Sequence, residues 1–181
     1  MFIRTKSIYG AKYAYLVESI WNKGKTRQQM KQYLGKVYYG GSTAPLRVER
    51  LLEGIKTDEP LLSYSQKTAL MEHILSCLLC DLGFTYVDKK FRLDQMLDSG
   101  KTLSILVNKK VEFLNKKPAC IEVNEGFLCT PTLTAFRKIV AEFENAEKKA
   151  QFLADTLLTC GISLERDAFV ELFHILSDTE E

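Results

Sequence analysis

The first forty residues constrain the fold of this chain more than any other stretch, because they combine a strand pattern with one sign of charge. Residues 1–40 contain eight Lys or Arg side chains and a single acid, Glu18, so this basic head carries +7. The acidic body, residues 41–181, holds 17 Lys or Arg against 22 Asp or Glu, a net −5. The total charge of +2 therefore hides two segregated parts.

The basic head contains three extended runs that are joined by short turns bearing glycine. The runs cover residues 2–8, 13–21 and 26–34. In the second run Tyr13, Tyr15 and Trp21 fall on one face by strict alternation, because strand side chains have a period of two. Extended runs with short Gly turns are typical of hairpins. The sequence therefore predicts a three-stranded antiparallel meander.

The same alternation predicts which long side chains gather on this sheet. One face of the third run would carry Arg27, Gln29, Lys31 and Tyr33. The opposite assignment stays open, and it would turn Gln28, Met30 and Gln32 outward. Long hydrogen-bond donors beside aromatic rings suit phosphates, base edges and stacked bases. The predicted nucleic-acid-binding residues are Arg4, Lys6, Lys12, Tyr13, Tyr15, Lys23, Lys25, Arg27, Gln29 and Lys31, with Trp21 for stacking or support.

A simpler interpretation is a solvated sheet whose lysines deter aggregation between strand edges. That interpretation would tolerate acids equally well, yet the head has only one, which favours a polyanionic partner. A two-stranded ribbon fits the major groove of B-DNA, whereas the major groove of A-form RNA is deep and narrow. DNA is therefore preferred over RNA, and single-stranded or ribosomal RNA remains the alternative.

Part of the basic head resembles a known segment. The resemblance is carried by residues 13–19 (YAYLVES), Gly24-Lys25, Arg27-Gln28 and residues 33–35 (YLG). Residues 1–38 resemble the amino-terminal segment of insertion-sequence transposases of the DDE type, and equally short stand-alone archaeal proteins of unknown function. In the transposases this segment precedes a nuclease core and helps to hold DNA. The strand-Asp, strand-Asp, helix-Glu arrangement of that core is not found here, so the resemblance implies DNA binding without cleavage.

The sequence of the acidic body predicts a mainly helical structure. Helices are expected over residues 46–55, 65–82, 130–143 and 146–160, with another starting at 163–166 and one or two helical turns at 91–98. Short extended runs are expected at 84–87, 103–107, 111–114, 119–123 and 127–129. Residues 40–45 (GGSTAP) mark a linker or an ordered turn. The predicted fold class is α+β: the meander, then a mainly helical domain that can hold a second small β-meander.

These boundaries predict two domains. Residues 1–40 would form a basic β-sheet module that binds nucleic acid, and residues 46–181 an acidic, mainly α-helical domain whose role the sequence does not reveal. A protein partner for that helical domain is the alternative function, with the protein acting as an adaptor. No apolar run is long enough to span a membrane, and no secretory signal begins the chain. Five cysteines without regular spacing favour a reducing, cytoplasmic setting.

The sequence indicates neither catalytic residues, nor a metal site, nor a cofactor. Cys77 and Cys80 have a spacing seen in zinc sites, with Cys120 and Cys129 as the other pair. Cysteines inside an apolar helix more often act as small hydrophobic residues. The two histidines, His73 and His174, have no nucleophile in a local motif, and the carboxylate pairs Asp94–Asp98 and Asp167–Glu171 fit solvated helix faces. The predicted function is therefore non-enzymatic binding of nucleic acid.

Overall fold

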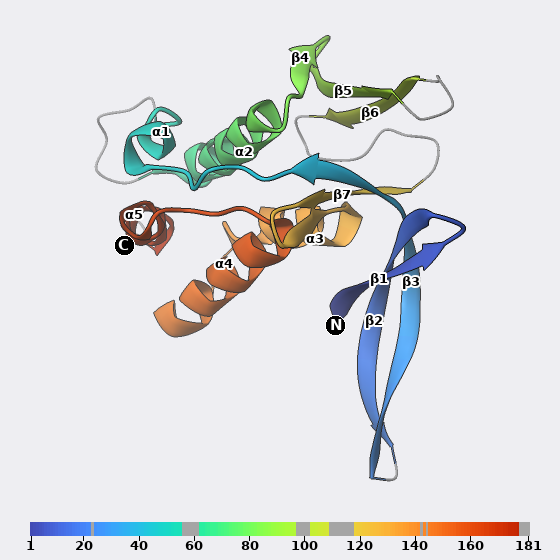
Figure 1. Cartoon of the computed structure of the whole chain (residues 1–181). Coiled ribbons are helices and arrows are strands. Elements are labelled where there is room, and N and C mark those ends of the chain that lie inside the picture. The colour runs from blue at the N-terminus through green and yellow to red at the C-terminus, as the bar shows by residue number, and fades with distance from the viewer. Residues whose placement is uncertain are drawn as a thin grey trace.

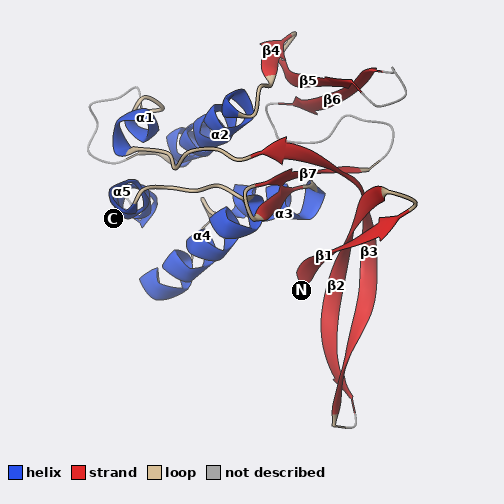
Figure 2. Cartoon of the chain, in the orientation of Figure 1, coloured by secondary structure: helices blue, strands red, loops and turns tan. Residues whose placement is uncertain are grey.

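The computed structural model describes residues 1–22, 24–55, 62–96, 102–108, 118–141, 143 and 145–177. Within these residues the fold is α+β, with eight strands and five helices (Figure 2). The strands form one five-stranded sheet and one three-stranded sheet. The predicted 111–114 strand and the carboxyl-terminal tail, 178–181, lie outside the described residues.

The larger sheet begins with the predicted meander. Its first three strands are antiparallel neighbours: β1 (Phe2–Ile8), β2 (Ala11–Asn22) and β3 (Lys25–Gly41). Strand β3 also pairs in parallel with β7 (Ala119–Val123), which pairs antiparallel with β8 (Gly126–Leu128). The order is β1-β2-β3-β7-β8, so the sheet is mixed and spans both predicted domains. The run at 119–123 therefore joins the main sheet rather than a second meander.

Glycine at position 35 allows β3 and β7 to approach each other. Gly35 has a φ of 112°, and a Cβ built there would lie 2.0 Å from the carbonyl oxygen of Pro118, just before β7. No side chain fits at that distance, and the backbone conformation also favours glycine. The parallel pairing that follows, from Lys36↔Ala119 onward, depends on this close contact.

The smaller sheet is a second antiparallel meander. It contains β4 (Thr85–Val87), β5 (Lys90–Met96) and β6 (Thr102–Asn108) in that order. The expected helical turns at 91–98 are wrong, since most of this range belongs to β5. The residues of β5 alternate, with Phe91 buried and Leu93 packed against the main core. Tyr86 on β4 contacts the Phe91 ring at a centroid distance of 4.9 Å, which secures the strand pair.

Five helices pack around the body strands (Figure 1). They are α1 (Val48–Leu52), α2 (Tyr64–Asp81), α3 (Thr130–Lys138), α4 (Ala146–Cys160) and α5 (Arg166–Ser177). Helix α4 has its predicted bounds, with Asn145 as N-cap and Gly161 in the left-handed conformation after it. Helix α2 starts earlier than predicted, because Ser63 rather than Ser65 forms a capping box with Gln66. Helix α3 ends at Lys138, earlier than the predicted 143.

Two apolar clusters hold these elements together. The main core contains buried side chains of α2, α3, α4 and α5, with Ile121 and Val123 from β7. A smaller cluster attaches the basic head to the body, and it consists of Ala14, Leu34, Val37, Cys120 and Cys129. Burying apolar surface in this way stabilises a fold by about 25 cal/mol per Å². The inner half of the meander is therefore anchored on β7 and the start of α3.

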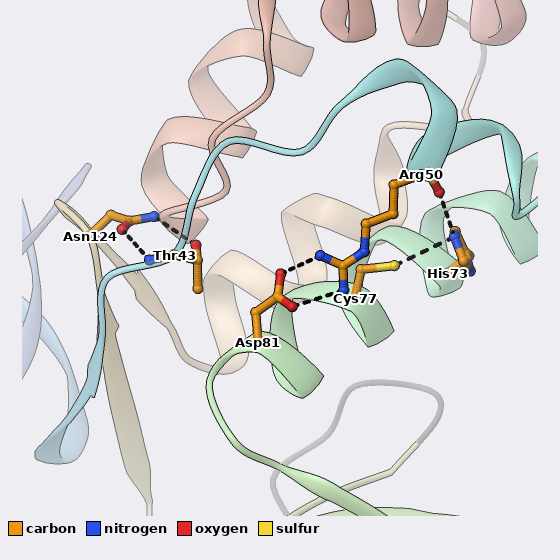
Figure 3. A network of polar contacts seen from close by, with 6 residues as sticks. All are labelled: Thr43, Arg50, His73, Cys77, Asp81 and Asn124. Carbon is orange, nitrogen blue, oxygen red and sulfur yellow. Dashed lines mark hydrogen bonds and ion pairs between the residues drawn. The ribbon is translucent and has the colours of Figure 1, made fainter.

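Residues 42–45, between β3 and α1, form an ordered connection. The backbone N–H of Thr43 donates to Asn124 Oδ1 at 3.0 Å, and Asn124 Nδ2 donates to the carbonyl oxygen of Gly161 at 2.7 Å. The Asn124–Thr43 contact is drawn in Figure 3. Just beyond, Leu46 N–H donates to the carbonyl oxygen of Ser163 at 2.8 Å. These contacts agree with the ordered-turn alternative for this stretch.

Candidate nucleic-acid interface

The far end of the β2–β3 hairpin extends away from the rest of the molecule (Figure 1). Strand β1 pairs with β2 only as far as Phe2↔Val17, so beyond that point β2 and β3 pair with each other alone. We call residues 18–29 the hairpin arm. Every described residue of the arm is exposed except Glu18, which is half-buried. Isolated two-stranded hairpins are marginally stable in water, so the arm is suited to ordering against a partner.

Strand register shows that the two faces of the arm differ. Directly paired residues of antiparallel strands lie on the same face. One face, the hollow face, continues from the arm onto β1, because Arg4↔Tyr15, Val17↔Met30 and Ser19↔Gln28 are pairs. A hollow of about 580 Å³ lies on it, lined by Arg4, Thr5, Lys6, Tyr15, Val17, Gln28 and Met30. The guanidinium of Arg4 donates to Gln28 Oε1 across the hollow.

The opposite face carries Arg27 and Gln29. Arg27 pairs with Ile20, and Gln29 pairs with Glu18. The ammonium group of Lys31 lies 2.8 Å from Glu18 Oε2. This hydrogen bond and the Lys31 charge lower the pKa of Glu18, which keeps its carboxylate ionised at the base of the arm.

The predicted shared face of Arg27, Gln29, Lys31 and Tyr33 is correct for Arg27 and Gln29 and wrong for Tyr33. The pairing skips Lys31 between Met30 and Gln32, and skips Leu34 between Tyr33 and Gly35. Each extra residue is a β-bulge that inverts the alternation beyond it. Tyr33 consequently sits with Tyr13 and Tyr15 on the hollow face, at ring distances of 6.3 and 5.5 Å. Of the alternative set, Gln28 and Met30 share that face and Gln32 does not.

The basic residues of the head also differ in their partners. The ammonium of Lys12 lies 2.6 Å from Glu122 Oε1 on β7, and Lys36 lies 5.4 Å from the Tyr38 ring centroid. Lys31 is paired with Glu18, as described above. Among the residues that the structure describes, five cations of the head have no acidic partner: Arg4, Lys6, Lys25, Arg27 and Lys36. Lys23 lies outside them.

Exposed apolar side chains accompany these cations. Trp21 is 72% exposed and Met30 is 61% exposed, both on the hollow face. Large apolar groups exposed on one face of a sheet are typical of contact surfaces. Val17 and Met30, which help to line the hollow, were absent from the predicted binding set. The signal for Met30 was the inverted assignment of faces that the sequence left open.

A second polar network lies in the body and joins α1 to α2 (Figure 3). The Arg50 guanidinium donates to both Asp81 carboxylate oxygens, at 2.7 and 2.8 Å. His73 Nε2 lies 2.9 Å from the carbonyl oxygen of Arg50 and 3.5 Å from Cys77 Sγ. A carbonyl oxygen only accepts hydrogen bonds, so Nε2 carries the hydrogen and cannot take a proton from the thiol. Burial raises the pKa of Cys77, and the network acts as a structural connection.

The remaining sequence candidates are dispersed. Cys77 and Cys80 lie on α2, whereas Cys120 and Cys129 belong to the cluster that anchors the head. Across the described ranges, no three His, Cys, Asp or Glu side chains are grouped so that they could hold a metal ion. No described helix is long and apolar enough to cross a membrane.

Comparisons with protein-family models, curated proteins and solved structures found no match for this chain.

Proposed function

We propose that this protein binds duplex DNA through the hairpin arm and the adjoining face of β1. The observation that carries the proposal is the arm itself: a two-stranded ribbon, exposed on both faces, whose Lys25 and Arg27 have no acidic partner among the described residues. Cations placed in this way release counterions from DNA when they contact phosphates, which is the main source of affinity in non-specific binding.

The dimensions of the arm support insertion into a groove. Five residues of β2, Glu18 to Asn22, extend beyond the end of the β1 pairing. At about 3.3 Å per residue the arm reaches roughly 16 Å. The major groove of B-DNA is about 8.5 Å deep and about 12 Å wide, enough for a two-stranded ribbon. The arm can therefore reach base edges while Arg4 and Lys6 remain outside the groove.

Two further predictions belong with this proposal. The resemblance of residues 1–38 to the DNA-holding segment of transposases is consistent with DNA as the partner. RNA fits the ribbon less well, because the A-form major groove is deep and narrow. A protein partner for the helical body remains a prediction without a surface assigned to it.

Fluorescence anisotropy with a labelled duplex tests the proposal through its salt dependence. If four or five phosphates are neutralised, the plot of log K against log salt should have a slope of about −4. The double variant Lys25→Ala/Arg27→Ala should reduce the magnitude of the slope by about 2, since each phosphate contact contributes about 0.9. The matched control is Lys12→Gln, which removes a cation of the head that Glu122 already neutralises. This control should leave the slope unchanged.

The same titration includes single-stranded DNA and duplex RNA of the same sequence. Tighter binding to RNA would overturn the preference for DNA. Absence of binding to every nucleic acid at low salt would refute the proposed function altogether. Equal slopes for the double variant and the wild type would show that the arm is not the contact surface.

A further inference from the structure

Trp21 occupies the last part of the arm before its turn. It is the only tryptophan in the sequence, and it pairs with Thr26, one position before the final pair Asn22↔Lys25. Its side chain is 72% exposed. Among the described residues it makes no aromatic ring contact, in contrast to the tyrosines nearer the base of the sheet. Packing within the chain therefore gives no reason for a large apolar ring at this position.

The surroundings of Trp21 indicate what would cover it. Lys25 and Arg27 flank its partner Thr26 on the facing strand, so their side chains lie on the opposite face of the ribbon from the Trp21 ring, and neither has an acidic partner among the described residues. A thin ribbon that carries an apolar ring on one face and cations on the other matches a groove of a nucleic acid, in which flat bases lie between lines of phosphates. A protein surface would instead need apolar contacts around the whole ring, and its cross-strand partner Thr26 is polar.

The length of the arm places this ring at the depth of the bases. Trp21 lies four residues beyond Val17, where β1 stops pairing, which corresponds to roughly 13 Å. The major groove is only about 8.5 Å deep. A groove that the arm enters from its turn would thus bring Trp21 against the base stack rather than against phosphates.

We propose that Trp21 stacks on a nucleobase, and that the arm therefore selects duplex DNA containing an unpaired base. Inserting an apolar side chain into an intact duplex requires two stacked base pairs to separate. A bulged or mismatched base has already lost part of its pairing and stacking, so the same insertion costs less. This inference rests on the proposed function and specifies the DNA substrate of the same surface.

The single tryptophan makes the test direct. Intrinsic fluorescence and anisotropy are followed while the full chain is titrated with an intact duplex and with the same duplex carrying one extra, unpaired base. The expected result is quenching of Trp21 emission by the bulged duplex and a dissociation constant lower by roughly 10- to 100-fold than for the intact one. Trp21→Ala should bind both duplexes equally, and Trp21→Phe should recover part of the preference.

The matched control is Tyr64→Ala, which removes an aromatic side chain of similar exposure, 68%, at the start of α2. It should keep the full preference. Equal affinity of the wild type for the two duplexes, or a preference retained by Trp21→Ala, would overturn the inference and leave the proposed function standing. Failure to bind either duplex would overturn both. Thermal unfolding of each variant verifies that the fold is intact.

Discussion

At the scale of single residues, buried polar groups of the body are placed against backbone carbonyls. Cys160, the last residue of α4, is fully buried, and its thiol donates to the carbonyl oxygen of Thr132 at 3.5 Å. Burial is the main cause that raises the pKa of this thiol to about 12. The neutral thiol is therefore the form that the folded state accommodates.

This shift predicts how stability depends on pH. Above pH 9 the thiol of Cys160 ionises in the unfolded chain but not in the native one. The unfolded state then binds fewer protons, so the free energy of unfolding falls as pH rises, until about pH 12. The contribution of this one group is about 1.4 kcal/mol per pH unit.

Urea unfolding under reducing conditions at several values between pH 8 and pH 11 measures this effect. Cys160→Ala should lose stability less steeply with rising pH than the wild type, whatever its stability at pH 8. Parallel curves for the two proteins would contradict the assigned cause. The other buried cysteines affect both proteins alike and cancel in the comparison.

At the scale of elements, the parallel pairing of β3 with β7 is the junction on which the mixed sheet depends. Gly35 permits it, because the nearest atoms to an added Cβ are backbone atoms of Pro118 and Ala119, which cannot move independently of β7. The β-bulges at Lys31 and Leu34 lie just before this paired segment and turn the strand from the arm into the core.

A side chain at this junction should therefore be costly. We expect Gly35→Ala to lower the free energy of unfolding by at least about 3 kcal/mol, from the clash combined with its positive φ. The control is Gly10→Ala, where φ is also positive, 76°, but nothing lies within 4 Å of the added Cβ. It should cost about 1 kcal/mol from backbone strain alone. Chemical denaturation measures both, and equal losses would argue against a steric junction.

At the scale of the whole molecule, stability and the proposed binding surface reside in different parts. The two apolar clusters take their buried side chains from residues outside the arm. The arm therefore contributes little buried apolar area to folding, while it presents Trp21, Lys25 and Arg27 to solvent.

Removing the arm should separate the two properties. Because Glu18 pairs with Gln29, replacing residues 19–28 by Asn-Gly closes the hairpin with a two-residue turn that preserves the register. We expect the melting temperature to change little and duplex DNA binding to be lost. Calorimetry and anisotropy measure the two outcomes. A large loss of stability would mean that the arm supports the fold, and retained binding would place the DNA site elsewhere.

Much of the local structure was predictable from the sequence. The bounds of β1 and α4 match the prediction, because hydrophobic periodicity, turn glycines and an Asn cap are properties of neighbouring residues. The helical expectation at 91–98 failed for the opposite reason. Phe91 and Leu93 alternate in a short polar segment whose sequence pattern for a strand is weak. Its pairing with β4 and β6 makes it a strand.

The candidate site was predictable only in part. The charge segregation of the head and its antiparallel meander follow from composition and pattern, and the sequence determined both. Which side chains share a face was decided by the tertiary structure, since the bulges at Lys31 and Leu34 arise where β3 leaves the arm to pair with β7. The same holds for Lys12, whose charge is neutralised by Glu122, 110 positions away along the chain. Charge and periodicity are local properties of a chain, whereas register and ion pairing depend on which distant segments pack together.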